Sequence, residues 1–163
     1  MKKNIYYFLI SLLLMTAFAC SAKSNKEIKN EPSLKGALKG KFYIGTALNV
    51  TQIHGIDTAS INIVKNEFDA IVAENCMKSM FLQPKEGEFF FEDADKFVEF
   101  GEQNNLYITG HCLIWHSQAP SWFFVDNDGK DVSAEVLKQR MKTHITTVVS
   151  RYKGRIKGWD VVN

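Results

Sequence analysis

Residues 110–122 read GHCLIWHSQAPSW, with two histidines, two tryptophans and a glutamine packed closely together. The preceding residues 106–110 form a short apolar run that predicts a buried β-strand. Tryptophan offers an apolar face on which a sugar ring can stack, and His111 and Gln118 can hydrogen-bond hydroxyl groups. With Trp115 between them, these residues indicate a ligand site just after the strand.

Other interpretations of the same residues stay open. The tryptophans can anchor a core, with the histidines bonded structurally. A metal or redox site would use His111, Cys112 and His116, but the spacing H-C-x-x-x-H fits no common zinc pattern. We therefore predict no metal and no cofactor.

Polar residues also follow two other apolar runs. Residues 69–73 predict a strand that ends at Glu74, and residues 156–162 predict one that ends at Asn163. Glu74 opens the segment ENCMK, in which Asn75 and Lys78 add a carboxamide and an ammonium group. Taken alone, this segment is more typical of a solvated loop than of a ligand site.

Strands and helices are expected to alternate along the chain. Residues 42–48 predict the first strand, and apolar residues at helical spacing predict three helices: residues 58–68, a helix capped by Asp93, and one capped by Ser133 that runs to Tyr152. Such alternation indicates an α/β fold with parallel strands. The carboxyl ends of parallel strands share one edge, so the polar residues that follow them predict one site.

The N-terminus has the features of an export signal. Lys2 and Lys3 precede an apolar run over residues 5–19, which is shorter than the roughly 20 residues of a membrane span. Residues 17–21, AFACS, resemble a bacterial lipobox, which predicts a signal at residues 1–19 and lipid on Cys20. Residues 20–40 are expected to be a flexible tether and residues 41–163 the fold. We expect a secreted or cell-envelope lipoprotein that meets a membrane only through this anchor.

Composition excludes some classes of function. The 163 residues are 45% hydrophobic and 23% charged, which suits a globular domain. The net charge of +2 disappears once Lys2 and Lys3 are removed, so there is no electrostatic case for nucleic acid. Cys76 and Cys112 would allow one disulfide, and the isolated His54 and His144 are expected in surface or helix-face roles, not in catalysis.

Four motifs, in the same order along the chain, resemble those of glycoside hydrolase family 10, the retaining endo-β-1,4-xylanases. They are AENCMK, PKEGEFFFEDAD, GHCLIWHSQAPSW and WDVVN, and the resemblance covers about residues 42–163. The resemblance implies a TIM (β/α)₈ barrel, of which this chain supplies the first four strands and three helices. The chain departs from the family pattern at Ser79, where tryptophan is frequent, and at Cys76 and Cys112.

The resemblance also implies roles for the polar residues. Glu74, Asn75 and Lys78 would bind a xylose unit on the glycone side of xylan or a xylo-oligosaccharide. The sugar next to the scissile bond would be held by His111, Trp115 and Gln118, and its 2-hydroxyl by Asn163. His116 would be structural.

The resemblance places no catalytic residue within this chain. In the family, the acid/base glutamate directly follows the asparagine that corresponds to Asn163, and the nucleophile lies near the end of the seventh strand. Retaining hydrolysis needs both carboxyl groups. We therefore expect residues 1–163 alone to be inactive and marginally folded. The alternative is a non-catalytic, xylan-binding lipoprotein.

Overall fold

The computed structural model describes residues 32–163. The predicted signal, Cys20 and residues 21–31 of the predicted tether lie outside the described residues. Within the remaining part of that tether, the short helix α2 (Leu34–Leu38) is capped by the side chain of Ser33. The backbone N–H of Leu34 donates to a carboxylate oxygen of Glu67 at 2.7 Å. Regular structure therefore begins before residue 41, where we expected the fold to start.

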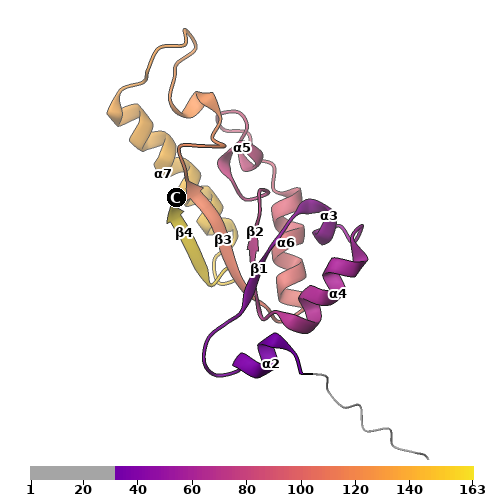
Figure 1. Ribbon diagram of the computed structural model, residues 1–163. Coiled ribbons are helices and arrows are strands. Elements are labelled where there is room, and N and C mark those ends of the chain that lie inside the picture. The colour runs from indigo at the N-terminus through magenta and orange to yellow at the C-terminus, as the bar shows by residue number, and fades with distance from the viewer. Residues whose placement is uncertain (1–31) are drawn as a thin grey trace, which may run out of the picture. The chain divides into compact units, whose positions relative to one another are not determined.

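Four parallel strands form one sheet in the order β1-β2-β3-β4 (Figure 1). Their bounds are β1 (Gly45–Leu48), β2 (Ala70–Ala73), β3 (Tyr107–Ile114) and β4 (Gly158–Val162). The three predicted helices lie between them as α4 (Thr58–Glu67), α6 (Glu92–Gln103) and α7 (Ala134–Arg151). The predicted alternation and the parallel sheet are confirmed.

Three single-turn helices were not predicted, namely α3 (Val50–Ile53), α5 (Ser79–Leu82) and η1 (Ser121–Phe123). Ser133 caps α7 as expected, since its side chain accepts from the backbone of Val136. The prediction that Asp93 caps α6 is wrong, because the helix starts at Glu92. Asp93 lies instead in its first turn, where a negative charge is favourable, and binds His54 at 2.7 Å.

Strand β3 is longer than its sequence pattern indicated. It continues past Gly110 to Ile114, because the apolar Cys112 and Leu113 carry the buried pattern onward. The pairing with β4 shifts register between His111 and Ile114, and the His111–Cys112 peptide bond is cis. His111 therefore lies within the strand and not after its end. Strand β1, in contrast, starts three residues later than expected.

The hydrophobic core lies between the sheet and the helices. Leu48, Ile71 and Ile108 point to this side from three neighbouring strands and are almost fully buried, as is Phe97 of α6. Gly110 makes room here for the ring of Trp159, since a Cβ atom at residue 110 would lie 2.3 Å from it. Predicted apolar residues of α7 meet the same core, among them Val148 and Tyr152.

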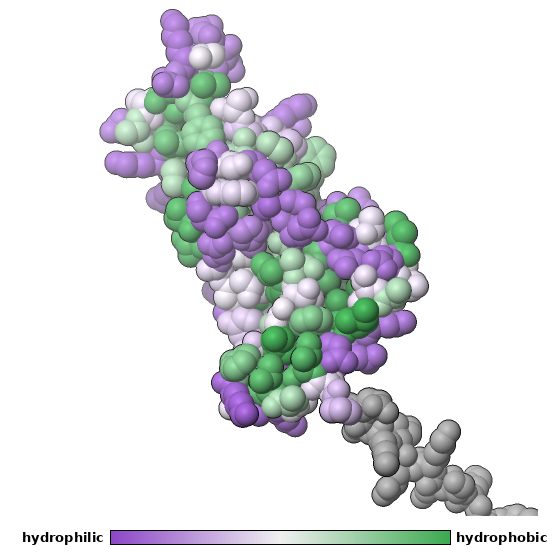
Figure 2. All heavy atoms as spheres, viewed as in Figure 1, coloured by the Kyte–Doolittle hydropathy of each residue, from purple (hydrophilic) through white to green (hydrophobic). Residues whose placement is uncertain are grey.

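The opposite face of the sheet carries small and polar side chains. A hollow of about 710 Å³ lies over it, lined by residues that include Gly45, Ala47, Thr109, His111 and Asp160. On the face drawn in Figure 2, hydrophilic residues gather across the middle and hydrophobic ones toward the lower end, near α2 in Figure 1. The two faces of the sheet therefore have different chemistry.

Two further sequence expectations can be compared with the structure. Cys76 and Cys112 are buried free thiols, so the disulfide that the sequence would have allowed is not formed between them. His54 is exposed, and His144 lies on the buried face of α7, in agreement with the expected surface or helix-face roles. Among residues 32–163, no helix has the length and apolar character needed to cross a membrane.

Candidate functional site

Four of the predicted site residues form one contact group around Lys78, here called the Lys78 cluster: Asn75, Lys78, Trp115 and Gln118. The ammonium group of Lys78 donates to Oδ1 of Asn75 at 2.9 Å and to Oε1 of Gln118 at 2.6 Å. It also lies 5.0 Å from the centroid of the Trp115 ring, within range of a cation–π interaction. Gln118 completes the group with a 3.3 Å bond from its own amide to Asn75.

Two segments that follow neighbouring strands bring the Lys78 cluster together. Residues 74–78 connect β2 to α5, and Trp115 and Gln118 lie in the loop that follows β3. The backbone N–H of Met80 donates to the carbonyl of Gln118 at 3.1 Å, which joins α5 to this loop. Gln118 has a positive φ of 48°, a conformation that few residues other than glycine adopt.

The chemistry of the Lys78 cluster suits an uncharged polyhydroxylated ligand. Lys78 is 8% exposed, and its charge is met here by two carboxamide oxygens and an aromatic face. The cluster therefore presents N–H donors, amide oxygens and one flat apolar surface within a few ångströms. Sugar hydroxyl groups and ring faces are complementary to that combination.

His111 adjoins the Lys78 cluster on the sheet. Its ring centroid lies 6.4 Å from that of Trp115, and its Nδ1 is 2.9 Å from a carboxylate oxygen of Asp160 on β4. With Nδ1–H donated to Asp160, the other ring nitrogen is left to meet a ligand. Sequence reasoning missed Asp160, although a single carboxylate inside an otherwise apolar strand was the signal that could have revealed it.

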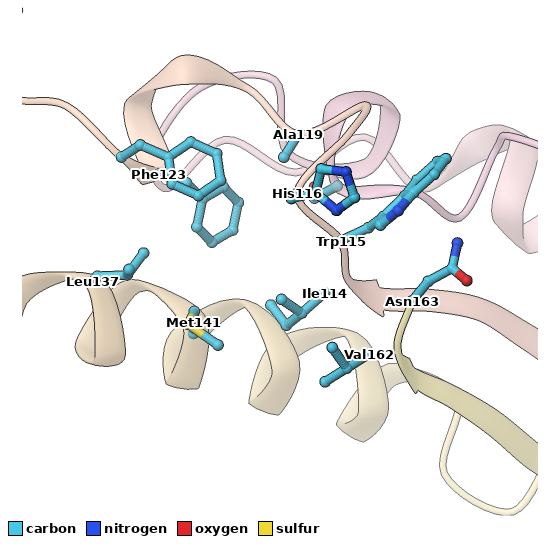
Figure 3. A pocket seen from close by; sticks show the side chains of 11 residues that line it. Ile114, Trp115, His116, Ala119, Phe123, Leu137, Met141, Val162 and Asn163 are labelled. Atoms are coloured by element: carbon cyan, nitrogen blue, oxygen red, sulfur yellow. The ribbon is translucent and has the colours of Figure 1, made fainter. Parts of the chain in front are cut away.

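Glu74 and Asn163 lie at the ends of their strands, as predicted. Glu74 is exposed, and its backbone N–H donates to the carbonyl of Leu48 at 2.9 Å. Asn163 is also exposed, and its N–H donates to the carbonyl of Ile114 at 3.1 Å. Figure 3 shows Asn163 beside Trp115. Neither side chain makes a contact to the Lys78 cluster among the hydrogen bonds of the described residues.

A second hollow of about 310 Å³ lies next to Asn163, between the loop after β3 and helix α7 (Figure 3). Its walls are mainly apolar and include Ile114, Phe123, Leu137 and Met141. Trp115 and His116 also line it, and through Trp115 it adjoins the Lys78 cluster. Ser79, His116 and Asn163 are its polar lining residues, so this hollow offers fewer hydrogen-bonding groups than apolar ones.

The two cysteines do not behave as reactive thiols. Burial, with a smaller contribution from Asp93, raises the pKa of Cys76 to about 12. Burial also raises the pKa of Cys112. Both thiols are therefore protonated at neutral pH, which does not suit metal binding or thiol chemistry, since both need the thiolate.

Comparison with known proteins identifies the family of the chain. The family model for glycosyl hydrolase family 10 matches residues 33–163. An endo-1,4-beta-xylanase A of Xylanibacter ruminicola is 45% identical over 161 residues, which cover 99% of this chain and 42% of that protein. An endo-1,4-beta-xylanase C of Paenibacillus barcinonensis is 47% identical over 137 residues, covering 83% of this chain and 12% of that protein.

Solved structures show the same likeness. A GH10 endoxylanase from a sugarcane soil metagenome matches with a TM-score of 0.77 and 44% identity, over 80% of this chain and 38% of that one. A mutant of an intracellular xylanase from Thermoanaerobacterium saccharolyticum, solved with xylotetraose, matches with a TM-score of 0.75 and 40% identity, over 82% and 43%.

This chain therefore spans less than half the length of these relatives, and its four parallel strands form part of a TIM barrel. The motif residues, the sheet and the family match all agree: the chain belongs to glycosyl hydrolase family 10.

Proposed function

We propose that the protein to which this chain belongs is an endo-1,4-β-xylanase that cleaves the xylan backbone with retention of configuration. The observation that carries the proposal is the Lys78 cluster, at the carboxyl-terminal edge of a parallel sheet. In barrels of this class, ligands bind at that edge. The family membership of the chain supports the same substrate class.

Each site residue has a role in this proposal. Glu74, Asn75 and Lys78 bind a xylose unit on the glycone side. His111 and Gln118 hydrogen-bond the sugar next to the scissile bond, and Trp115 supports it. Asn163 binds the 2-hydroxyl of that sugar. Asp160 holds His111 through the 2.9 Å contact, so that one defined ring nitrogen meets the substrate.

The chemical step needs two carboxyl groups about 5 Å apart, one to protonate the leaving oxygen and one to attack the anomeric carbon. Asp160 is committed to His111, and Glu74 lies on the proposed glycone side. Both catalytic glutamates are therefore proposed to follow Asn163 in the full-length gene product. This chain supplies the side of the cleft that binds and orients the sugar.

The proposal is tested with the full-length product of the gene on soluble xylan, by following reducing ends and the anomeric proton of the first product. We expect retained configuration. Lys78→Met should lower kcat/KM about 100-fold, since it removes a buried charge with two hydrogen bonds in the ligand site. Lys153→Met, at an exposed lysine, serves as the matched control. Unchanged activity in Lys78→Met would exclude the proposed role of the cluster.

A non-catalytic xylan-binding lipoprotein is the other candidate. It would bind xylo-oligosaccharides through the Lys78 cluster without releasing any product. Binding in calorimetry combined with no new reducing ends over a day would favour it over the xylanase.

We also propose that the protein is exported and anchored by lipid on Cys20. The basic and apolar N-terminal residues and the AFACS segment support this. Growth with a radiolabelled fatty acid should label the wild-type protein but not Cys20→Ala. Equal labelling of both proteins would refute the anchor.

A further inference from the structure

We propose that Arg140 is a positioning residue for sugar recognition, because it braces the loop that carries Trp115 and Gln118. This inference rests on the proposed function. Arg140 lies on α7, makes no hydrogen bond to the Lys78 cluster, and belongs to none of the motifs singled out in the sequence. Its effect on a sugar would be exerted through the loop.

The guanidinium group of Arg140 joins three parts of the chain. Its Nη1 donates to the carbonyl of Trp122 and, at 3.1 Å, to that of Val125, both in the segment that follows Gln118. Its Nε and Nη2 donate to the two carboxylate oxygens of Glu86 at 3.0 and 2.9 Å. One side chain on α7 therefore fixes the loop after β3 and the turn between α5 and α6.

Trp122 strengthens this brace. The guanidinium carbon of Arg140 lies 5.7 Å from the centroid of its ring, and the indole N–H donates to the carbonyl of Gln83 at 3.0 Å. Gln83 is itself 1% exposed and hydrogen-bonded to His144 at 2.9 Å. The loop is thus attached to the buried residues beneath α5 at one point and to Arg140 at two others.

The loop needs such support because its ligand-binding part is strained. Gln118 has a φ of 48°, which a residue with a side chain adopts at a cost of about 1 kcal/mol. Only three residues separate Gln118 from Trp122, whose carbonyl accepts a hydrogen bond from Arg140. If the clamp at Trp122 and Val125 is released, Gln118 can relax to negative φ, and its carboxamide then moves away from Lys78.

Arginine suits this position better than lysine. Its planar group offers donors in two directions, so it can meet a carboxylate on one side and backbone carbonyls on the other. The Arg140 side chain is 14% exposed, so water competes weakly for its donors. A lysine would keep the charge but could not make all of these contacts at once.

The test uses the full-length gene product and xylotetraose as the probe, with affinity measured by calorimetry and backbone exchange by deuterium uptake. Arg140→Lys should bind xylotetraose about tenfold more weakly, the equivalent of one lost hydrogen bond. Peptides that cover residues 115–125 should exchange faster. Glu86→Gln, a milder change in the same brace, should shift both quantities in the same direction by less.

The chain offers a matched control in Arg155, which makes the same two-pronged contact to Glu102, at 2.9 and 2.7 Å, away from the site. Arg155→Lys should lower stability comparably and leave the affinity for xylotetraose unchanged. A double-mutant cycle sharpens the test, since Arg140→Lys should add little to the loss already caused by Gln118→Ala.

Each outcome bears on the inference. Weaker binding and faster loop exchange in Arg140→Lys alone support it. Unchanged affinity in Arg140→Lys, or an equal loss in Arg155→Lys, overturns it and leaves the proposed function intact. An unmodified protein that binds no xylo-oligosaccharide overturns the proposed function, and this inference with it.

Discussion

The helix-covered face of the sheet and the opposite face are built from the same four strands but carry different side chains. Ile71 and Ile108 on the covered face are each 1% exposed, and Trp159 fills the space above Gly110. On the other face, Thr109 and Asp160 line an open hollow together with Gly45, Ala47 and Ala70. The covered face contributes burial of apolar surface, and the open face contributes hydrogen-bonding groups next to the site.

Successive side chains of a strand point to opposite faces of the sheet, so one register determines both faces. Neighbouring residues of β3, such as Ile108 and Thr109, point to opposite sides of the sheet, so a register slip of one residue would exchange core and site. Substitutions at adjacent positions should therefore have separate effects, on stability from one face and on recognition from the other.

The largest difference in the free energy of unfolding is expected between Ile108→Ala and Thr109→Ala. The first removes a fully buried side chain and leaves a cavity, so it should lower the free energy of unfolding by about 4 kcal/mol. The second removes only a hydroxyl and a methyl group from a half-buried side chain and should cost about 1 kcal/mol. Urea denaturation of both variants measures the difference, and similar losses would contradict the contrast between the faces.

Acid should destabilise the folded protein through the buried His144. Burial lowers the pKa of His144 from its ordinary 6.5 to about 4, because no protonated imidazole is favourable there. The unfolded chain binds this proton near pH 6.5 and the folded chain only near pH 4. Stability should therefore be intact above pH 6.5 and fall as pH drops toward 4, by on the order of 3 kcal/mol.

Denaturation at pH 7, 6 and 5 measures this loss. Asp95 and Glu102 have pKa values held below the ordinary range by hydrogen bonds from arginines, so their stabilisation is lost only at lower pH. His144→Asn should flatten the dependence between pH 7 and 5. A slope that survives in His144→Asn would assign the effect to another group.

Replacing a glycine with alanine should cost more stability on the covered face than on the open face. A Cβ atom at residue 110 would meet the Trp159 ring at 2.3 Å, so Gly110→Ala should cost about 2 kcal/mol by overpacking. A Cβ atom at residue 158 would meet the tip of the Tyr107 side chain at 3.1 Å, which a small rotation can relieve. Thermal melts of the two variants provide the comparison, and an equal shift would contradict it.

A further expected change belongs to the open face and concerns function. Asp160→Asn keeps the size of the side chain but removes the charge that holds Nδ1–H of His111. It should leave the melting temperature nearly unchanged and lower kcat/KM on xylan about tenfold, or 1.4 kcal/mol. A large drop in melting temperature would show that Asp160 supports the fold instead.

The sequence predicted the elements whose apolar pattern is long enough to recognise. The four strands and the helices α4, α6 and α7 fall near their expected positions, and the Ser133 cap is correct. Single-turn helices such as α3 and α5 were missed because four residues are too few for apolar side chains to repeat at helical spacing. The end of β3 was misplaced because the polar His111 interrupts an apolar run that continues beyond it.

Local sequence patterns could not show which side chains of the site contact each other. Lys78 and Gln118 are 40 residues apart in the chain, and His111 and Asp160 are 49 apart. Residue types and the family resemblance named most members of the site, but only the fold shows which side chain holds which. Asp160 and Arg140 escaped notice for that reason, since their partners are defined by three-dimensional contacts.

The conformation of Gln118 limits which sequences can occupy this position over evolutionary time. Asparagine tolerates a φ of 48° more readily, yet its side chain is one methylene shorter and would fall short of the 2.6 Å contact to Lys78. Glycine removes the strain and the carboxamide together. Both substitutions that relax the backbone thus give up the contact, so we expect glutamine at residue 118 and lysine at residue 78 to depend on each other.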